Sequence, residues 1–263
     1  MRYKLIAIDV DGTLVSDDFI ISDQNKSAIY AAVDRGVHVV LCSGRSYASL
    51  KLFADELGLN NYTISFNGCI IHKNGVVIHD MKLPAKTAFN ILHELKGFDI
   101  DPVVYWDIYG IYAYNKRKYA DLYLDTCKAE PTFINDFTEI TNDSLYKIIA
   151  LGENEVLQNV KHHFKRFDNV CNMFFSGHYL FEFCSPKASK GAALSSVCSL
   201  LKVSAEDTIA IGDSDNDISM IEAAGLGVAM QNANSHVKAS ANYITTNDCR
   251  NHGVAEVIDK FVL

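Results

Sequence analysis

The sequence predicts an α/β protein whose parallel-sheet core is split by an inserted α+β domain. Two observations carry this prediction. Short apolar runs alternate with helical patterns over residues 1–83 and 188–263, as is typical of a parallel sheet covered by helices. Residues 84–187 instead show helices beside paired strands, which is the pattern of an α+β domain. We therefore expect a core built from both ends of the chain and a smaller domain inserted between them.

The first part of the core begins with an apolar run at residues 5–10, which suits a strand buried on both faces. A helix follows, for which Ser22 is a suitable N-cap and Gly36 a suitable residue after the last turn. Asn74-Gly75 predicts a type I′ hairpin turn. The remaining segments are predicted as a strand at 37–41, a helix at 46–57, a strand at 62–66, and hairpin arms at 69–72 and 76–79.

The inserted segment and the end of the chain follow the same reasoning. Glycines separate two pairs of strands in the insertion, which is predicted as a helix at 89–95, strands at 103–106 and 111–114, a helix at 116–127, a strand at 145–151, a helix at 155–167, and a hairpin of 171–175 with 179–183. The α/β alternation then returns, with a helix at 191–201, a strand at 208–211, a helix at 217–224, strands at 226–229 and 243–245, and a closing helix from 254.

Composition excludes several classes of partner. The net charge of −8 argues against nucleic acid and anionic lipid, because both reward clustered Lys and Arg. No segment approaches the roughly 20 apolar residues needed to span a membrane, and the N-terminal apolar run ends at Asp9, too early for a signal peptide. We expect a soluble cytoplasmic protein, a monomer or small homo-oligomer, with no nucleic-acid and no membrane partner.

The cysteines predict a reduced protein. The count is odd, no Cys-x-x-Cys pair occurs, and the spacings suit neither a zinc site nor a disulfide framework. We expect most of them to be core residues in a reducing compartment. Their positions are 42, 69, 127, 171, 184, 198 and 249.

Two acidic clusters stand where predicted strands end. Asp9 and Asp11 follow the first strand, with Gly12 allowing a tight turn after them. Ligands bind at the carboxyl ends of strands in open α/β sheets, and two neighbouring carboxylates favour a cation. A surface turn is the alternative, since Asp-Gly is common in turns.

The second cluster contains three carboxylates, Asp213, Asp215 and Asp217, after the strand at 208–211. Such a group suits a hard cation such as Mg²⁺. A calcium loop starting at Asp213 would need Gly at its sixth position and Glu at its twelfth, where Ile218 and Ala224 stand, so that interpretation fails. The alternative is that the acidic residues cap the following helix.

Two shorter segments suit an anion. Ser43 and Gly44 leave a predicted strand and enter a helix, where a hydroxyl and free backbone N–H groups can bind a phosphate. An ordinary helix cap is the alternative. Lys190 opens another predicted helix, and taken alone it is an ordinary solvated lysine.

Together these four segments resemble the haloacid dehalogenase superfamily of phosphatases, and within it the Cof-type branch with an inserted cap domain. The family pattern runs Asp-x-Asp-Gly-Thr, a strand ending in Ser or Thr, Lys, and Gly-Asp-x-x-Asn-Asp. This order is matched by residues 9–13, Ser43, Lys190 and residues 212–217, and the resemblance covers nearly the whole chain. One departure is Asn251-His252 before Gly253, where relatives often carry an acidic residue.

The resemblance implies a Rossmann-like core and a Mg²⁺-dependent phosphatase. Asp9 would be the nucleophile that forms an aspartyl-phosphate, and Asp11 the general acid and base. The metal residues would be Asp9, Asp11 through its backbone carbonyl, and Asp213, with Asp217 beside them or bound through water. The phosphate ligands would be Ser43, Gly44, Lys190 and Asn216.

The resemblance also implies that residues 84–187 form a cap that sets the choice of a small phosphomonoester, such as a sugar phosphate or phosphorylated cofactor. The aromatic side chains considered for this role, none of which is assigned to it, are Trp106, Tyr112, His178 and Tyr179. Two alternative functions remain open: a sugar phosphomutase of the same fold and a catalytically silent ligand-binding regulator.

Overall fold

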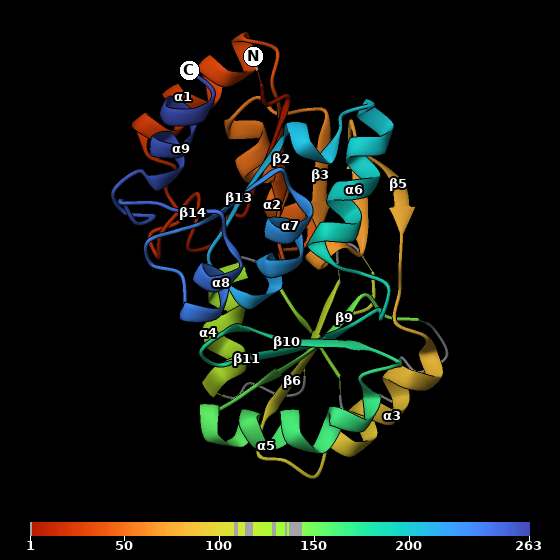
Figure 1. Cartoon of the computed structure of the whole chain (residues 1–263). Helices are drawn as coiled ribbons and strands as arrows, with labels where there is room; N and C mark the ends of the chain where they lie inside the picture. The colour runs from red at the N-terminus through yellow and green to blue at the C-terminus, as the bar shows by residue number, and fades with distance from the viewer. Residues whose placement is uncertain (1, 108–109, 114–117, 128–129, 135, 137–143) are drawn as a thin grey trace. The chain divides into compact units, whose positions relative to one another are not determined.

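The computed structural model describes residues 2–107, 110–113, 118–127, 130–134, 136 and 144–263. The chain divides into two compact units (Figure 1). The core unit comprises residues 1–44, 50–79 and 189–263, and the inserted unit comprises residues 45–49 and 80–188. The predicted fold class, a parallel-sheet α/β core interrupted by an α+β insertion, is confirmed.

The core unit contains an eight-stranded sheet in the order β14-β13-β12-β1-β2-β3-β4-β5. The strands from β14 to β3 are parallel, and β4 runs antiparallel to β3. Chain order reverses beside β1, which has β12 on one side and β2 on the other. The strands are β1 Leu5–Ile8, β2 His38–Cys42, β3 Tyr62–Ser65, β4 Ile70–Lys73, β5 Val76–Asp80, β12 Thr208–Gly212, β13 Leu226–Ala229 and β14 Tyr243–Ile244.

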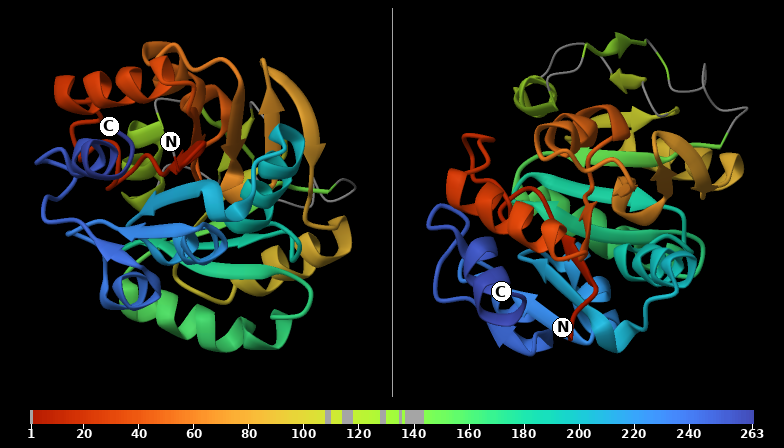
Figure 2. Two further views of the ribbon diagram at one scale, coloured as in Figure 1. Left: turned by 45° about the horizontal axis from the view of Figure 1, so that its top comes forward. Right: turned by 90° about the horizontal axis from the view of Figure 1, so that it is seen from above.

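Helices cover both faces of this sheet (Figure 2). One face packs against α1 (Asp23–Asp34), α2 (Tyr47–Glu56) and α9 (Gly253–Phe261). The opposite face packs against α6 (Lys190–Leu201) and α7 (Ile218–Ala223). A short helix, α8 (Ser235–Ser240), packs beside α7 and β13. Because β1 and β12 are buried on both faces, only their ends can present polar groups.

Local signals in the sequence set several boundaries. The Ser22 hydroxyl accepts a hydrogen bond from the Asn25 N–H, so it caps α1 as predicted. Asn74 and Gly75 both adopt positive φ, 51° and 79°, in the predicted turn between β4 and β5. The helix predicted at 217–224 begins differently. Residues 215–217 form a 3₁₀ turn, and α7 starts at Ile218, because the Asp217 carboxylate accepts the Ser214 N–H in a capping box.

The inserted unit contains a six-stranded sheet in the order β10-β11-β9-β6-β7-β8, antiparallel except for the pair β7–β8. Helices α3 (Ala85–Leu95) and α5 (Asn154–Phe164) pack on one face, and α4 (Lys118–Cys127) contacts β6. The strands are β6 Asp101–Tyr105, β7 Ile111–Ala113, β8 Thr132–Phe133, β9 Lys147–Leu151, β10 Asn172–Gly177 and β11 Leu180–Cys184.

Some boundaries in the insertion differ from the sequence prediction. The strand predicted at 145–151 begins at Lys147, because Leu145 instead bridges to Leu83. The helix predicted at 155–167 is α-helical only to Phe164, and 165–167 form a 3₁₀ turn. Strand β8 was not predicted, since its two residues carry no periodic signal. Residues 114, 116 and 117, predicted at the ends of a strand and a helix, lie outside the described residues.

The structure bears on the predicted state of the cysteines and on the prediction that no segment spans a membrane. Free thiols are buried at positions 42, 69, 171, 184 and 198, as expected for reduced core residues. Over the described ranges, none of the helices has both the length and the apolar character needed to cross a bilayer.

A buried ion pair joins two strands of the inserted sheet. The Lys147 ammonium on β9 lies 3.1 Å from the Glu182 carboxylate on β11, and both side chains are 3% exposed. The Ser176 hydroxyl on β10 donates a second hydrogen bond to Glu182. A buried charge is tolerated only while its partner remains, so this pair constrains both positions together.

We predict that Lys147→Met alone lowers the free energy of unfolding by about 3–5 kcal/mol, since it removes the ammonium that offsets the buried Glu182 charge. The double variant Lys147→Met, Glu182→Leu should recover most of this loss, because it removes both charges. Urea unfolding of the two variants measures the difference. Equal stability of the single and double variants would contradict the ion pair's role.

Candidate active site

The candidate site lies at the carboxyl ends of β1 and β12, the neighbouring strands where the sheet order reverses. Asp9 directly follows β1, and its N–H donates to the Ile211 carbonyl of β12 at 3.0 Å. Asp213 directly follows β12. Open α/β sheets bind ligands at such a point, because the connections on either side of it leave in opposite directions. The two acidic clusters of the sequence therefore meet at one edge of the sheet.

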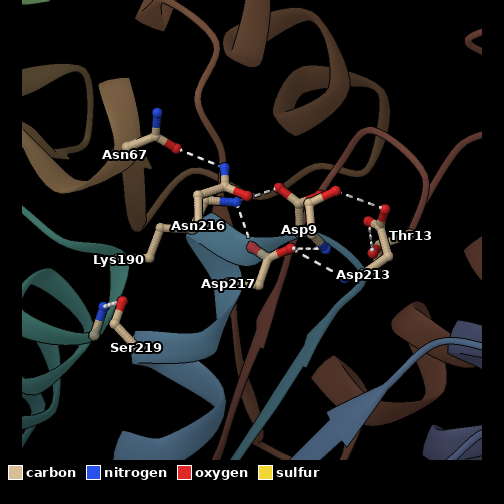
Figure 3. A network of polar contacts seen from close by, with 10 residues as sticks. Asp9, Thr13, Asn67, Lys190, Asp213, Asn216, Asp217 and Ser219 are labelled. Carbon is tan, nitrogen blue, oxygen red and sulfur yellow. Dashed lines mark hydrogen bonds and ion pairs between the residues drawn. The ribbon is translucent and has the colours of Figure 1, made fainter. Parts of the chain in front are cut away.

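Lys190 connects the two clusters (Figure 3). Its Nζ atom lies 2.6 Å from Asp9 Oδ1 and 2.5 Å from Asp217 Oδ1. The Lys190 and Asp217 side chains are fully buried, and Asp9 is 7% exposed. The ammonium is thus held by both carboxylates, and its residue is the first of α6 (Lys190–Leu201). Lys190 is thus a fixed part of the site rather than the solvated lysine of the alternative interpretation.

Close packing of α6 against α7 sets the position of Lys190. A Cβ atom on Gly191 would lie 2.1 Å from the Ser219 carbonyl oxygen, so a larger residue would push the two helices apart. The Ser189 hydroxyl caps α6 by accepting from the Ala192 N–H. The helix therefore begins at a fixed place with its first residue directed at the carboxylates.

Asp217 uses both oxygens to organise the site. Oδ1 accepts from Lys190, and Oδ2 accepts from the N–H groups of Asp213 and Ser214 at 3.0 Å each. This carboxylate thus orients the lysine and also folds the loop that carries Asp213. The alternative that the second acidic cluster caps a helix is correct for Asp217, which belongs to a capping box. The same residue also binds Lys190 in the site.

Asp213 is joined to the first acidic segment. Asp213 Oδ1 accepts from the Thr13 hydroxyl at 2.8 Å, and Oδ2 accepts from the Ser214 hydroxyl at 3.0 Å. Gly12 has φ +78°, and a Cβ atom there would lie 2.6 Å from Asp213 Oδ2. Both its conformation and this close approach require glycine. The segments that carry Thr13 and Asp213 therefore pack closely together although they lie 200 positions apart in the sequence.

The charges of the site are unbalanced. Oxygens of Asp9, Asp213 and Asp217 all lie within 4.8 Å of one another. Burial, reinforced by the Asp217 charge, raises the pKa of Asp9 well above its ordinary value and the pKa of Asp213 to about 7. Burial opposes the charge of Lys190, but the Asp217 and Asp9 carboxylates outweigh it and raise the pKa of the ammonium. The site thus contains three carboxylates and one ammonium, that of Lys190. Carboxylate oxygens are the ligands that a hard divalent cation prefers, so the donor atoms of the site fit such an ion.

Asp11 lies outside this group of three carboxylates. It occupies the loop after β1, where it forms a bridge with Val15, and its side chain is exposed. The Asp11 carboxyl group is therefore exposed, whereas Asp9, two residues earlier, is buried. Asp11 is thus close in sequence to the cluster but differs from it in environment.

Three of the four residues predicted to bind phosphate, Ser43, Gly44 and Asn216, contact Asn67, which the sequence did not single out. Ser43 is buried after β2, and its carbonyl accepts the Asn67 N–H at 3.0 Å. The Asn216 Nδ2 group donates to Asn67 Oδ1 at 2.8 Å, and Gly44 lies against the Asn67 amide. The available signal was Asn67-Gly68 after a predicted strand, which indicates a turn and nothing more.

The chain also has relatives of known class. A family model described as haloacid dehalogenase-like hydrolase matches residues 6–258. Phosphatase YwpJ of Bacillus subtilis is 33% identical, and the match covers 97% of this chain and 98% of that protein. The 5-amino-6-(5-phospho-D-ribitylamino)uracil phosphatase YcsE of the same organism is 34% identical, over 99% of this chain and 96% of that protein.

A solved structure gives the same result for the fold. A haloacid dehalogenase-like hydrolase from B. subtilis superposes with a TM-score of 0.88 and 31% identity, covering 99% of this chain and 100% of that chain. The resemblance found in the four sequence segments is confirmed. The chain therefore belongs to the haloacid dehalogenase-like hydrolases, and within them it is a phosphatase, a phosphoric monoester hydrolase.

Proposed function

We propose that this phosphatase hydrolyses small phosphomonoesters with the help of Mg²⁺, using Asp9 as its nucleophile. The observation that carries the proposal is the buried Asp9 carboxylate, held by Lys190 within a group of three carboxylates at the ends of β1 and β12. A buried anion gathered with other anions is unfavourable for stability alone. Such a group of carboxylates would instead serve to bind a cation beside a phosphoryl group.

Asp9 is positioned for attack on phosphorus. Lys190 holds Oδ1 at 2.6 Å and favours the ionised form, which is the nucleophilic one. Attack forms a bond from an Asp9 oxygen to phosphorus and breaks the bond from phosphorus to the leaving alkoxide oxygen. The product is an aspartyl-phosphate on Asp9 and a released alcohol.

Asp11 supplies and then removes the proton. Its exposed carboxyl group, two residues beyond the nucleophile, donates a proton to the leaving oxygen. The resulting carboxylate then takes a proton from water as that water attacks the phosphorus of the aspartyl-phosphate. This second step breaks the bond to Asp9, releases inorganic phosphate, and restores both side chains to their starting states.

Asp9 and Asp213 are the side chains that would hold Mg²⁺, together with the backbone carbonyl of Asp11 that the family resemblance implies. Both Asp217 oxygens already accept hydrogen bonds, so we assign Asp217 to orienting Lys190 and the Asp213 loop. When bound, the ion offsets the repulsion between the carboxylates and the phosphate dianion. Ser43, Gly44, Lys190 and Asn216 would contact the phosphoryl oxygens and stabilise the charge that spreads over them.

The names of the relatives support a proposal for the substrate class. One relative is named for 5-amino-6-(5-phospho-D-ribitylamino)uracil, a uracil that carries a phosphorylated ribitylamino group. We propose small substrates for this chain, either sugar phosphates or phosphorylated cofactors. We also propose that residues 84–187 set the choice among them. In this unit Trp106 and Tyr112 pack against the hydrophobic core, and Tyr179 is 43% exposed.

We predict that Asp9→Asn lowers kcat by about a thousandfold or more, because an amide cannot form the acyl-phosphate bond of the intermediate. Phosphate release from a panel of phosphomonoesters with Mg²⁺ measures this. Asp34→Asn, an exposed change in α1, is the matched control and should leave the rate unchanged. Turnover that survives Asp9→Asn would contradict the nucleophile, and isomerised sugar phosphate without free phosphate would indicate a mutase.

We predict that the Mg²⁺ concentration giving half-maximal activity falls by about tenfold between pH 6 and pH 8. The reason is the Asp213 pKa of about 7, which leaves the carboxyl group largely protonated below pH 7 and ionised above it, so protons compete with the cation on the acid side. Initial rates at several Mg²⁺ concentrations and pH values measure the change. A half-maximal concentration that is the same at both pH values would contradict the assignment of Asp213.

A further inference from the structure

The turn after β3 has an unusual backbone. Phe66, Asn67 and Gly68 have φ values of 49°, 56° and 94°, so three consecutive residues lie in the left-handed region. Glycine adopts this region readily and asparagine does so occasionally, whereas for Phe66 the surrounding contacts must hold it. Phe66 is fully buried and Asn67 is 2% exposed. Strained, buried turns of this kind cluster at functional sites.

Asn67 contacts two segments of the proposed phosphate site. Its N–H donates to the Ser43 carbonyl at 3.0 Å. Its Oδ1 accepts from Asn216 Nδ2 at 2.8 Å (Figure 3). Its amide also packs against Gly44, because a Cβ atom on Gly44 would lie 3.1 Å from both Nδ2 and Oδ1 of Asn67. One residue thus holds the backbone after β2 and a side chain from the loop after β12.

The next residue reaches a third segment. A Cβ atom on Gly68 would lie 2.2 Å from the Ser189 carbonyl oxygen and 3.2 Å from the backbone nitrogen of Lys190. The turn backbone therefore packs directly on the start of α6, from which Lys190 extends. All four residues assigned to phosphate, Ser43, Gly44, Lys190 and Asn216, thus belong to segments in contact with this one turn.

The bond to Asn67 fixes the orientation of the Asn216 amide. Asn216 Oδ1 is buried and makes no hydrogen bond within the described part of the chain. Its Nδ2 group has two hydrogens, of which one is directed to Asn67. The second hydrogen is then presented in a fixed direction, and an N–H group is the donor that an anionic oxygen requires.

We propose that Asn67 is a positioning residue of this phosphatase, which holds the Asn216 amide and the Ser43–Gly44 backbone in the arrangement that binds a phosphoryl group. The inference rests on the proposed phosphate-binding role of these residues. Asn67 need not touch the substrate itself. Its effect is to fix donors before binding, so that less freedom is lost when phosphate arrives.

Asn67→Gly tests this role, because glycine keeps the left-handed backbone and removes only the amide. We expect the KM for a phosphomonoester and the inhibition constant of inorganic phosphate to rise by about tenfold, with a smaller change in kcat. Asn74→Gly is the matched control: it makes the same exchange at φ 51° in the exposed turn between β4 and β5, and it should leave both constants unchanged.

A double-variant cycle separates positioning from general structure. If Asn67 acts through Asn216, then Asn67→Gly combined with Asn216→Ala should weaken phosphate binding no more than Asn216→Ala alone. Additive effects, or a lower Tm for Asn67→Gly with unchanged KM and inhibition constant, would overturn the proposal.

The same proposal can be tested apart from catalysis. Calorimetric titration of inorganic phosphate in the presence of Mg²⁺ should show a Kd about tenfold higher for Asn67→Gly than for the wild type. If the wild type binds phosphate but releases none from esters, the proposed phosphatase mechanism fails while Asn67 is still tested. A wild type that binds no phosphate would overturn both.

Discussion

The site depends on one buried contact, the Lys190 ammonium between the Asp9 and Asp217 carboxylates. Burying three charged groups is costly, and it is tolerated only when each has a partner at short distance. Much of the surrounding structure provides those distances. Gly191 lets α6 approach α7, and the Asp217 carboxylate folds the loop that presents Asp213. Removing the lysine would leave two buried carboxylates facing each other, with a third beside them.

The same arrangement explains why the site favours added positive charge. Burial and neighbouring carboxylates raise the pKa values of Asp9 and Asp213, so the protein alone does not balance its own charges. Functional sites characteristically contain such imbalance and backbone strain, and the left-handed turn at Asn67 is a second example close by. Both features are unfavourable for stability, and in the proposed mechanism a bound cation would offset the charge imbalance.

The sequence predicted most of this core because its strands are continuous apolar runs and its acidic residues follow their carboxyl ends. Parallel strands bring those ends to one edge, so the meeting of Asp9 with Asp213 followed from the fold class. The contact of Lys190 with Asp9 spans 181 positions, and no local pattern predicts it; it was available only through family resemblance. Asn67 was missed because Asn-Gly after a strand is an ordinary turn signal, and its importance appears only when Asn216 and Gly44 are seen beside it.

The most direct test of the mechanism is to isolate the covalent form of Asp9. In Asp11→Asn the nucleophile remains, but no base activates water, so the second half-reaction should be slowed more than the first. The variant is mixed with Mg²⁺ and a reactive phosphomonoester, quenched in acid, digested, and analysed by mass spectrometry. The mechanism predicts one added phosphoryl group on the peptide that contains Asp9. A phosphoryl group on another residue, or full turnover by Asp11→Asn with no phosphorylated peptide, would contradict it.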